Sequence, residues 1–173
     1  MEMTKVYKES MPDVKLVGKR YTNEDRDKTG TFAGCWQQAF REGWFDTLKQ
    51  CVPIPGVSDA YLGMMRFTGE GQDFEYWIGC FFAPGTTIPD GFGAVDIPAG
   101  EIGVCWLYGN EKNGELYSAE ASDLCMAAMV QKGWSFSQQG WFFERYICPR
   151  FTSPDEHGNV ILDICAYLTP DEK

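Results

Sequence analysis

Residues 101–168 contain the stretches that decide the fold: EIGVCWLYG at 101–109, ELYSAEASDLCMAAMVQK at 115–132, WFFERYICP at 141–149 and VILDICAYL at 160–168. The first, third and fourth are short, largely apolar runs of the kind that form strands, and a turn-rich segment separates the last two. The second has the length and composition of a helix. This part of the chain therefore predicts the order strand, helix, strand, strand.

The ends of the predicted helix carry suitable residues. Asn113 lies near its N-cap, Glu115 lies in its first turn, where a negative charge is favourable, and Gly133 follows its end as a C-cap. These residues support a helix over residues 115–132.

The preceding part of the chain repeats the same order. An amphipathic helix is expected over 32–50, FAGCWQQAFREGWFDTLKQ, because its apolar residues fall near helical spacing and it ends before Pro53. The expected strands are VKLVGKRY at 14–21, AYLGMMRF at 60–67, FEYWIGCFF at 74–82 and a short one at 93–97. The segment TGEGQD at 68–73 has the composition of a hairpin loop.

Two β-α-β-β units predict an α+β fold in which helices cover one side of antiparallel sheets. We expect one domain over residues 1–173, built from halves at about 5–83 and 93–169 that are related by a pseudo-twofold axis. Two such halves leave a cleft between them, and clefts of this kind are common ligand sites.

Charge argues against a nucleic-acid partner. The chain has 15 Lys and Arg against 25 Asp and Glu, for a net charge of −10, and so lacks a phosphate-neutralising surface. Residues 1–28 hold seven basic and six acidic groups in no block, which we interpret as solvated charge.

The cysteines and the N-terminal residues indicate which cellular compartment and which cofactors to expect. The seven cysteines form no CxxC pair and only one histidine, His157, accompanies them, so we expect neither a metal site nor a cofactor. No apolar leader and no membrane-spanning run occurs, which favours a cytoplasmic protein with reduced, mostly buried thiols.

Aromatic residues make up 15% of the chain, including six Trp. A large core and a pocket lined by rigid aromatic rings are both consistent with this enrichment, and composition does not choose between them.

The strand WFFERYICP carries one charge on each face. Alternation places Glu144 beside Phe142 and Tyr146, and Arg145 on the opposite face. At least one of the two charges should be shielded from water, which is costly unless the charge is paired. Either the pairing lies within the sheet, for instance with Asp163, or a carboxylate faces the cleft and serves a ligand.

An ordered set of segments resembles the GyrI-like small-molecule-binding domain, also called the effector-binding domain of multidrug-responsive transcription activators. The resemblance covers roughly residues 5–169. The segments that carry it are GKRY, the helix with Trp36, FEYWIG, PDGFGAVDIPAG, FERY running into PRF, and VILDICAYL.

The resemblance implies two split β-α-β-β modules whose antiparallel sheets form a concave cleft, covered by two helices, with a central aromatic cavity. The glutamate that projects into this cavity in members that bind lipophilic cations matches Glu144, and aromatic positions on the first and fifth strands match Tyr21, Trp106 and Tyr108. One departure is Val160, where the drug-binding activators have a pocket tyrosine. The activators also carry a helix-turn-helix, for which this sequence leaves no residues, so we expect no DNA-binding domain.

Stand-alone members of the family fall into two further classes. Some resemble the gyrase-inhibitory protein. Others, which the Trp-rich strands here resemble most, look like hydrolases that open the cyclopropane of DNA-alkylating natural products in self-protection. That chemistry implies Glu144 as the carboxylate that activates water, Tyr108 or Tyr146 as a donor to the developing phenolate, and Trp77, Trp106 and Trp141 as an aromatic slot.

Three functions are therefore expected from the sequence: a binding module for bulky, aromatic, lipophilic or cationic compounds, a hydrolase of reactive cyclopropanoids, and an inhibitor that acts through a protein interface. The expected partner of the first two is a small aromatic molecule, with no membrane contact.

Overall fold

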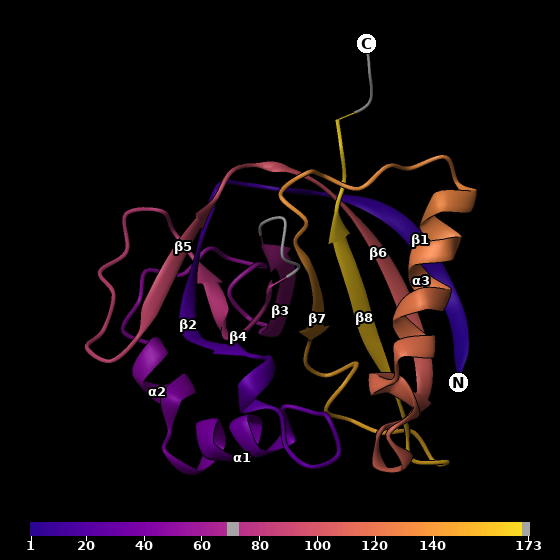
Figure 1. Cartoon of the computed structure of the whole chain (residues 1–173), viewed down its shortest axis with the longest axis horizontal. Helices are drawn as coiled ribbons and strands as arrows, with labels where there is room; N and C mark the ends of the chain where they lie inside the picture. Colours follow the sequence, from indigo (N-terminus) through magenta and orange to yellow (C-terminus); the bar gives the residue numbers. More distant parts are fainter. Residues whose placement is uncertain (69–72, 171–173) are drawn as a thin grey trace. The chain divides into compact units, whose positions relative to one another are not determined.

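The computed structural model describes residues 1–68 and 73–170. Within them it contains eight strands, whose described pairings are all antiparallel, and three α-helices (Figure 1). The predicted α+β fold is confirmed. The chain divides into two compact units: unit 1 is Met1–Pro12 with Ala99–Lys173, and unit 2 is Asp13–Pro98.

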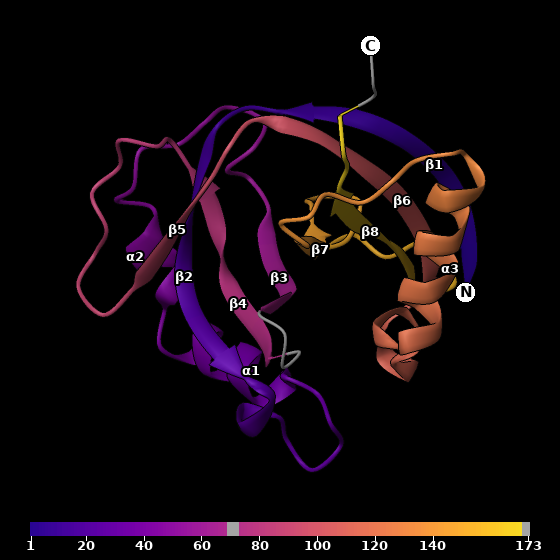
Figure 2. The same cartoon turned by 45° about the horizontal axis from the view of Figure 1, so that its top comes forward.

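Unit 1 is a four-stranded sheet in the order β1-β6-β8-β7 with one helix packed on it (Figure 2). Its elements are β1 (Glu2–Met11), β6 (Gly100–Asn110), α3 (Ala119–Gln131), β7 (Phe142–Tyr146) and β8 (Asn159–Tyr167). Apolar side chains of α3, β6 and β8 form one buried cluster, which includes Cys105, Leu107, Met129, Leu162 and Ile164.

Unit 2 has the corresponding sheet in the order β3-β4-β2-β5, with two short helices. Its elements are β2 (Val14–Thr22), α1 (Ala33–Arg41), α2 (Trp44–Leu48), β3 (Tyr61–Thr68), β4 (Asp73–Phe82) and β5 (Gly93–Ile97). Most of the hairpin loop predicted at 68–73 lies outside the described residues.

The strand β1 was not predicted. Its residues pair with β6 from Glu2 opposite Tyr108 to Met11 opposite Gly100, so four of the charges interpreted as solvated, those of Glu2, Lys5, Lys8 and Glu9, belong to an edge strand. Edge strands commonly carry charged residues because these discourage pairing with other chains, and the same charges hide the strand in the sequence. The N-terminal strand therefore belongs to the unit that also holds residues 99–173.

The two predicted helices begin or continue differently from expectation. The helix expected over 32–50 is broken into α1 and α2 at Gly43, whose φ of 68° is left-handed and readily adopted only by glycine. The helix expected from 115 begins as α3 at Ala119, because the Ser118 hydroxyl accepts a hydrogen bond from the Ala121 backbone N–H at 3.1 Å. Gly133, with a φ of 79°, follows α3 as predicted.

In the portion that the structure describes, no helix is long and apolar enough to cross a membrane.

Candidate functional site

The unit 1 sheet has two chemically different faces. One is covered by α3 and holds Leu107, Leu162 and Ile164. Glu144 is in register with Ile164 of β8, so the two side chains share this face. Arg145 is in register with Asp163, which in turn is opposite Trp106 of β6, so these three lie on the other face.

On the α3 side, Glu144 and Tyr146 lie next to one another at positions i and i+2 of β7. The Tyr146 hydroxyl donates a 2.7 Å hydrogen bond to Oε2 of Glu144, and both side chains are half-buried. The ring of Tyr146 packs edge-to-face on Phe151 with centroids 4.8 Å apart. Burial raises the pKa of Tyr117, and the negative charges of Glu111 and Glu144 raise it further. The Glu144 carboxylate therefore lies among aromatic groups.

On the opposite face, one buried network spans the sheet from β7 to β1. Nε of Arg145 donates to Asp163 at 3.1 Å, and its two terminal nitrogens donate to Glu9 at 2.8 and 2.9 Å. Arg150 also donates to Asp163, at 2.9 to 3.2 Å. Asp163 is 1% and Arg145 8% exposed. The expectation of a pair within the sheet is confirmed for Arg145.

These ion pairs set the charge states of the network. The hydrogen bonds from Arg145 lower the pKa of Glu9 despite its partial burial. Burial opposes the charge of Arg145, but the surrounding negative groups outweigh it and raise the pKa of the guanidinium. Asp163 is thus neutralised by two guanidinium groups.

Unit 2 contains a parallel arrangement around Glu75 of β4. This carboxylate is 4% exposed and accepts from Arg20 at 3.0 Å, from Arg66 at 2.8 Å and from the Trp77 indole at 3.2 Å. Arg66 on β3 is directly opposite Glu75, just as Arg145 on β7 is directly opposite Asp163. Each unit therefore buries one carboxylate between two arginines.

The predicted site residues of unit 1 are divided between the two faces. Glu144 and Tyr146 lie together on the α3 side. Trp106 and Tyr108 of β6 lie on the other face, where Tyr108 donates to Asp155 and accepts from the Asn159 side-chain amide at 3.0 Å. A flat molecule lying on one face of this sheet would not contact both sets.

The remaining predicted residues are mostly buried. Trp141 of unit 1 is 2% exposed, and Trp77 of unit 2 is 6% exposed. The Trp77 ring lies so close to Gly93 that a Cβ there would be 3.2 Å from it. Tyr21 of unit 2 is half-buried, with its ring centroid 6.4 Å from that of Phe32.

The Glu75 network of unit 2 was not predicted from the sequence, and in unit 1 three residues near Asp163 or Glu144 were missed. Glu9 lies in the unpredicted strand β1, and Tyr117 lies in a 3-10 turn before α3. Arg150 follows the FERY segment. Its pairing could have been inferred from Asp163, because an acid in an apolar strand needs positively charged partners.

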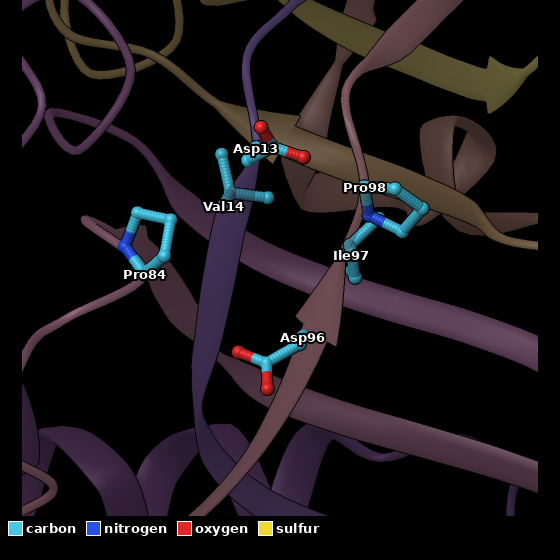
Figure 3. A pocket seen from close by; sticks show the side chains of 6 residues that line it. All are labelled: Asp13, Val14, Pro84, Asp96, Ile97 and Pro98. Atoms are coloured by element: carbon cyan, nitrogen blue, oxygen red, sulfur yellow. The ribbon is translucent and has the colours of Figure 1, made fainter.

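A shallow, open depression of about 410 Å³ lies in unit 2, between the start of β2 and the end of β5 (Figure 3). Its lining comprises Asp13, Val14, Pro84, Asp96, Ile97 and Pro98. Asp96 is paired with Lys15 at 2.5 Å. None of the predicted site residues lines this depression. Across the described ranges, no group of three or more His, Cys, Asp or Glu side chains is arranged to hold a metal.

Comparison with known proteins identifies the fold. No family model matches the sequence, and no curated protein matches it. Among solved structures, a bacterial protein from Staphylococcus aureus MU50, described as a candidate transcription regulator, superposes with a TM-score of 0.68 at 17% identity over 96% of this chain and 99% of its own.

Two further structures agree. SAV2435, solved bound to tetraphenylphosphonium, matches with a TM-score of 0.69 at 16% identity over 96% of this chain and 94% of its own. The C-terminal domain of EcmrR matches with a TM-score of 0.52 at 15% identity, over 98% of this chain and 99% of its own. These likenesses show the fold, which is the one that the resemblance implied: over nearly its whole length, the chain has the fold of the GyrI-like effector-binding domains.

Proposed function

We propose that this protein binds bulky, lipophilic aromatic molecules, cations among them, and that Glu144 supplies the counter-charge. The observation that carries the proposal is the setting of this carboxylate: it is half-buried, hydrogen-bonded by the Tyr146 hydroxyl and close to aromatic rings. Asp163 and Glu75 differ from it in burial, because they are 1% and 4% exposed and each lies between two arginines.

The physical basis is electrostatic. A carboxylate in a partly desolvated, aromatic setting attracts a cation more strongly than it would in bulk water, and ring faces add further attraction. A ligand that spreads its charge over aromatic groups matches both features. The structure of SAV2435 with tetraphenylphosphonium supports this ligand class, since that protein has the same fold.

Glu144 and Tyr146 form the part of the proposed site that the geometry supports directly. We propose Tyr21, Trp77, Trp106, Tyr108 and Trp141 as further ligand-binding residues on the strength of the resemblance. Because these residues occupy both units and both faces of the unit 1 sheet, a substitution at each should be scored separately for ligand affinity.

The test is a calorimetric titration with tetraphenylphosphonium. Replacing Glu144 by Gln keeps the shape and removes the charge, and should weaken binding by about tenfold, equivalent to about 1.4 kcal/mol. Glu156→Gln is the matched control, because it makes the same charge change at an exposed loop position. Equal affinities of the two variants would overturn the role of Glu144.

A second candidate function is hydrolysis of cyclopropanoid compounds. The contact between the Tyr146 hydroxyl and Glu144 favours it, because it brings a proton donor and a carboxylate within 2.7 Å. Glu144 would deprotonate water, which adds to a cyclopropane carbon as the C–C bond breaks and its electrons form a phenolate, with Tyr146 as the donor on the same face. A spirocyclopropyl-cyclohexadienone should then open faster than in buffer, and Glu144→Gln should abolish most of the acceleration.

The interaction alternative has one observation in its favour. Phe40 of α1 is 57% exposed, and its ring lies 6.0 Å from that of Tyr61, which is 36% exposed. Exposed aromatic pairs of this kind occur at protein interfaces. If this protein inhibits a partner such as gyrase, Phe40→Ser should abolish the inhibition while leaving tetraphenylphosphonium affinity unchanged.

A further inference from the structure

Two aromatic rings meet at a right angle on the face of the unit 1 sheet opposite to α3. The ring centroids of Tyr7 on β1 and Trp106 on β6 are 6.1 Å apart, and their planes make an angle of 85°. Both side chains are half-buried. We call the space between these two rings the aromatic corner.

The aromatic corner is occupied by an ammonium group of the chain itself. Nζ of Lys5 lies 4.6 Å from the ring centroid of Tyr7 and 4.6 Å from that of Trp106. Both distances are within the ~6 Å over which a ring face attracts a cation. The Lys5 side chain is exposed, and with residues 1–68 and 73–170 it makes no hydrogen bond or ion pair. The contacts with the two rings are therefore the interactions that Lys5 makes with the described residues.

A second cation on Trp106 is held quite differently. The guanidinium carbon of Arg150 lies 4.3 Å from the Trp106 centroid. Arg150 is fixed by its hydrogen bonds to the buried Asp163, and it helps to hold the indole ring in place. Lys5 has no such attachment, so it is the cation that a free ion could replace.

Charged groups of both signs lie near the aromatic corner. Besides Lys5, the charged groups that act on Tyr7 or contact Trp106 are the carboxylates of Glu9 and Asp163 and the guanidinium groups of Arg145 and Arg150. Glu9 is the nearest carboxylate to Tyr7, whose hydroxyl donates to it at 3.5 Å. A cation entering the corner therefore meets two ring faces, with the Glu9 carboxylate beside the Tyr7 hydroxyl.

We propose that Tyr7 and Trp106 form a binding site for small alkylammonium ions, which Lys5 occupies as a built-in substitute and which a free ion enters by displacing it. The site lies on the opposite face of the sheet from Glu144. It shares Trp106 with the ligand-binding residues proposed above, but it lies on the other face from Glu144 and does not rest on the role of that carboxylate.

The experiment compares choline with its neutral isostere 3,3-dimethylbutan-1-ol on the wild-type protein and on Lys5→Gln. A tethered side chain competes at an effective concentration that can reach the millimolar range, so removing it should tighten choline binding by about tenfold. The neutral isostere should bind more weakly than choline to both proteins. Lys28→Gln, the same charge change at an exposed position of unit 2, should behave as wild type.

Two double variants locate the bound ion. Lys5→Gln combined with Trp106→Leu, or with Tyr7→Leu, should lose the gained affinity, and Tyr7 on the edge strand keeps the test valid if loss of Trp106 unfolds the protein. The Trp106 indole N–H resonance, identified by its absence in Trp106→Phe, should shift on addition of choline to Lys5→Gln. Adding Glu144→Gln to Lys5→Gln should change none of this.

The proposal is overturned if Lys5→Gln binds choline no more tightly than wild type, or if either folded double variant binds it as tightly as Lys5→Gln. It is also overturned if Glu144→Gln removes choline binding, because the ion would then occupy the other face. A normal tetraphenylphosphonium titration alongside any of these results leaves the proposed function standing.

Discussion

Glu144 and Asp163 lie on neighbouring strands of one sheet, yet their carboxylates are placed for opposite roles. Asp163 is fully buried, and two arginines neutralise it. Through Arg145, which also binds Glu9, its ion pairs connect β8 with β7 and β1. Glu144 lies on the other face, is half-buried, and accepts a hydrogen bond from the hydroxyl of Tyr146. A carboxylate buried between two arginines stabilises the protein, whereas a half-buried one set among aromatic groups is accessible to a ligand.

Unit 2 contains an ion pair that corresponds to Arg145–Asp163 of unit 1. Its Arg66–Glu75 pair occupies the same place in the sheet as Arg145–Asp163. The residue before Arg66 on β3 is Met65, whereas the residue before Arg145 on β7 is Glu144. The structural ion pair is thus present in both units, and the additional carboxylate only in unit 1.

The largest expected effect is on stability at Asp163. Asp163→Asn leaves Arg145 and Arg150 without the buried carboxylate that neutralises them. We expect a loss of about 3 kcal/mol in the free energy of unfolding. Glu144→Gln should change it by less than about 0.5 kcal/mol. Urea unfolding of both variants measures the difference, and equal losses would contradict the distinction between the two carboxylates.

A smaller loss is expected at Trp77 in unit 2. Trp77→Phe removes the indole hydrogen bond to the buried Glu75 and leaves a small void, at a cost of about 1 to 2 kcal/mol. Trp134→Phe is the control, because Trp134 is only half-buried. If the two variants unfold at the same urea concentration, the Trp77–Glu75 hydrogen bond does not contribute to stability.

Stability should also fall in acid because of Glu9. Its pKa is lowered from the usual 4.5 by Arg145, so the folded state holds this proton less tightly than the unfolded state. The contribution is therefore present above about pH 5 and lost as the pH falls through and below 4.5. Unfolding free energies measured from pH 6 to pH 3 should fall less steeply in Glu9→Gln than in wild type. Parallel curves would show that Glu9 is not coupled to folding.

The smallest effect is expected at Tyr146. Tyr146→Phe removes the hydroxyl that donates to Glu144, in a half-buried position, and should lower stability by about 0.5 kcal/mol. Tetraphenylphosphonium should bind slightly more tightly, by about twofold, since the carboxylate loses a competing donor. A tenfold loss of affinity would instead mean that the hydroxyl itself contacts the ligand.

Much of the fold follows from local sequence patterns. A short strand was expected at the observed bounds of β5, Gly93–Ile97, and alternation put Glu144 and Arg145 on opposite faces of β7. The pair between Arg145 and Asp163 was one of the expected alternatives because both charges interrupt apolar strands. The break in the predicted helix at Gly43 was missed, because the helical spacing of apolar residues continues across this left-handed glycine.

The remaining features depend on information that no single segment carries. β1 was missed because its charges serve an edge strand and conceal its alternation, and Glu9 was missed with it. The separation of Trp106 and Tyr108 from Glu144 follows from the register of β6 and β8, which the sequence of one strand does not specify. The shared face of Glu144 and Tyr146 was thus predicted by alternation along β7, whereas the placement of Trp106 and Tyr108 relative to them was not.

The central claim, that Glu144 is a carboxylate available to a ligand cation, is tested most directly by charge selectivity. The measurement is the ratio of the dissociation constants of neutral triphenylphosphine oxide and cationic tetraphenylphosphonium, in wild type and in Glu144→Met, which makes β7 resemble β3 of unit 2. We predict a ratio of about ten in wild type and about one in the variant. An unchanged ratio in a variant that folds and binds both compounds would contradict the claim.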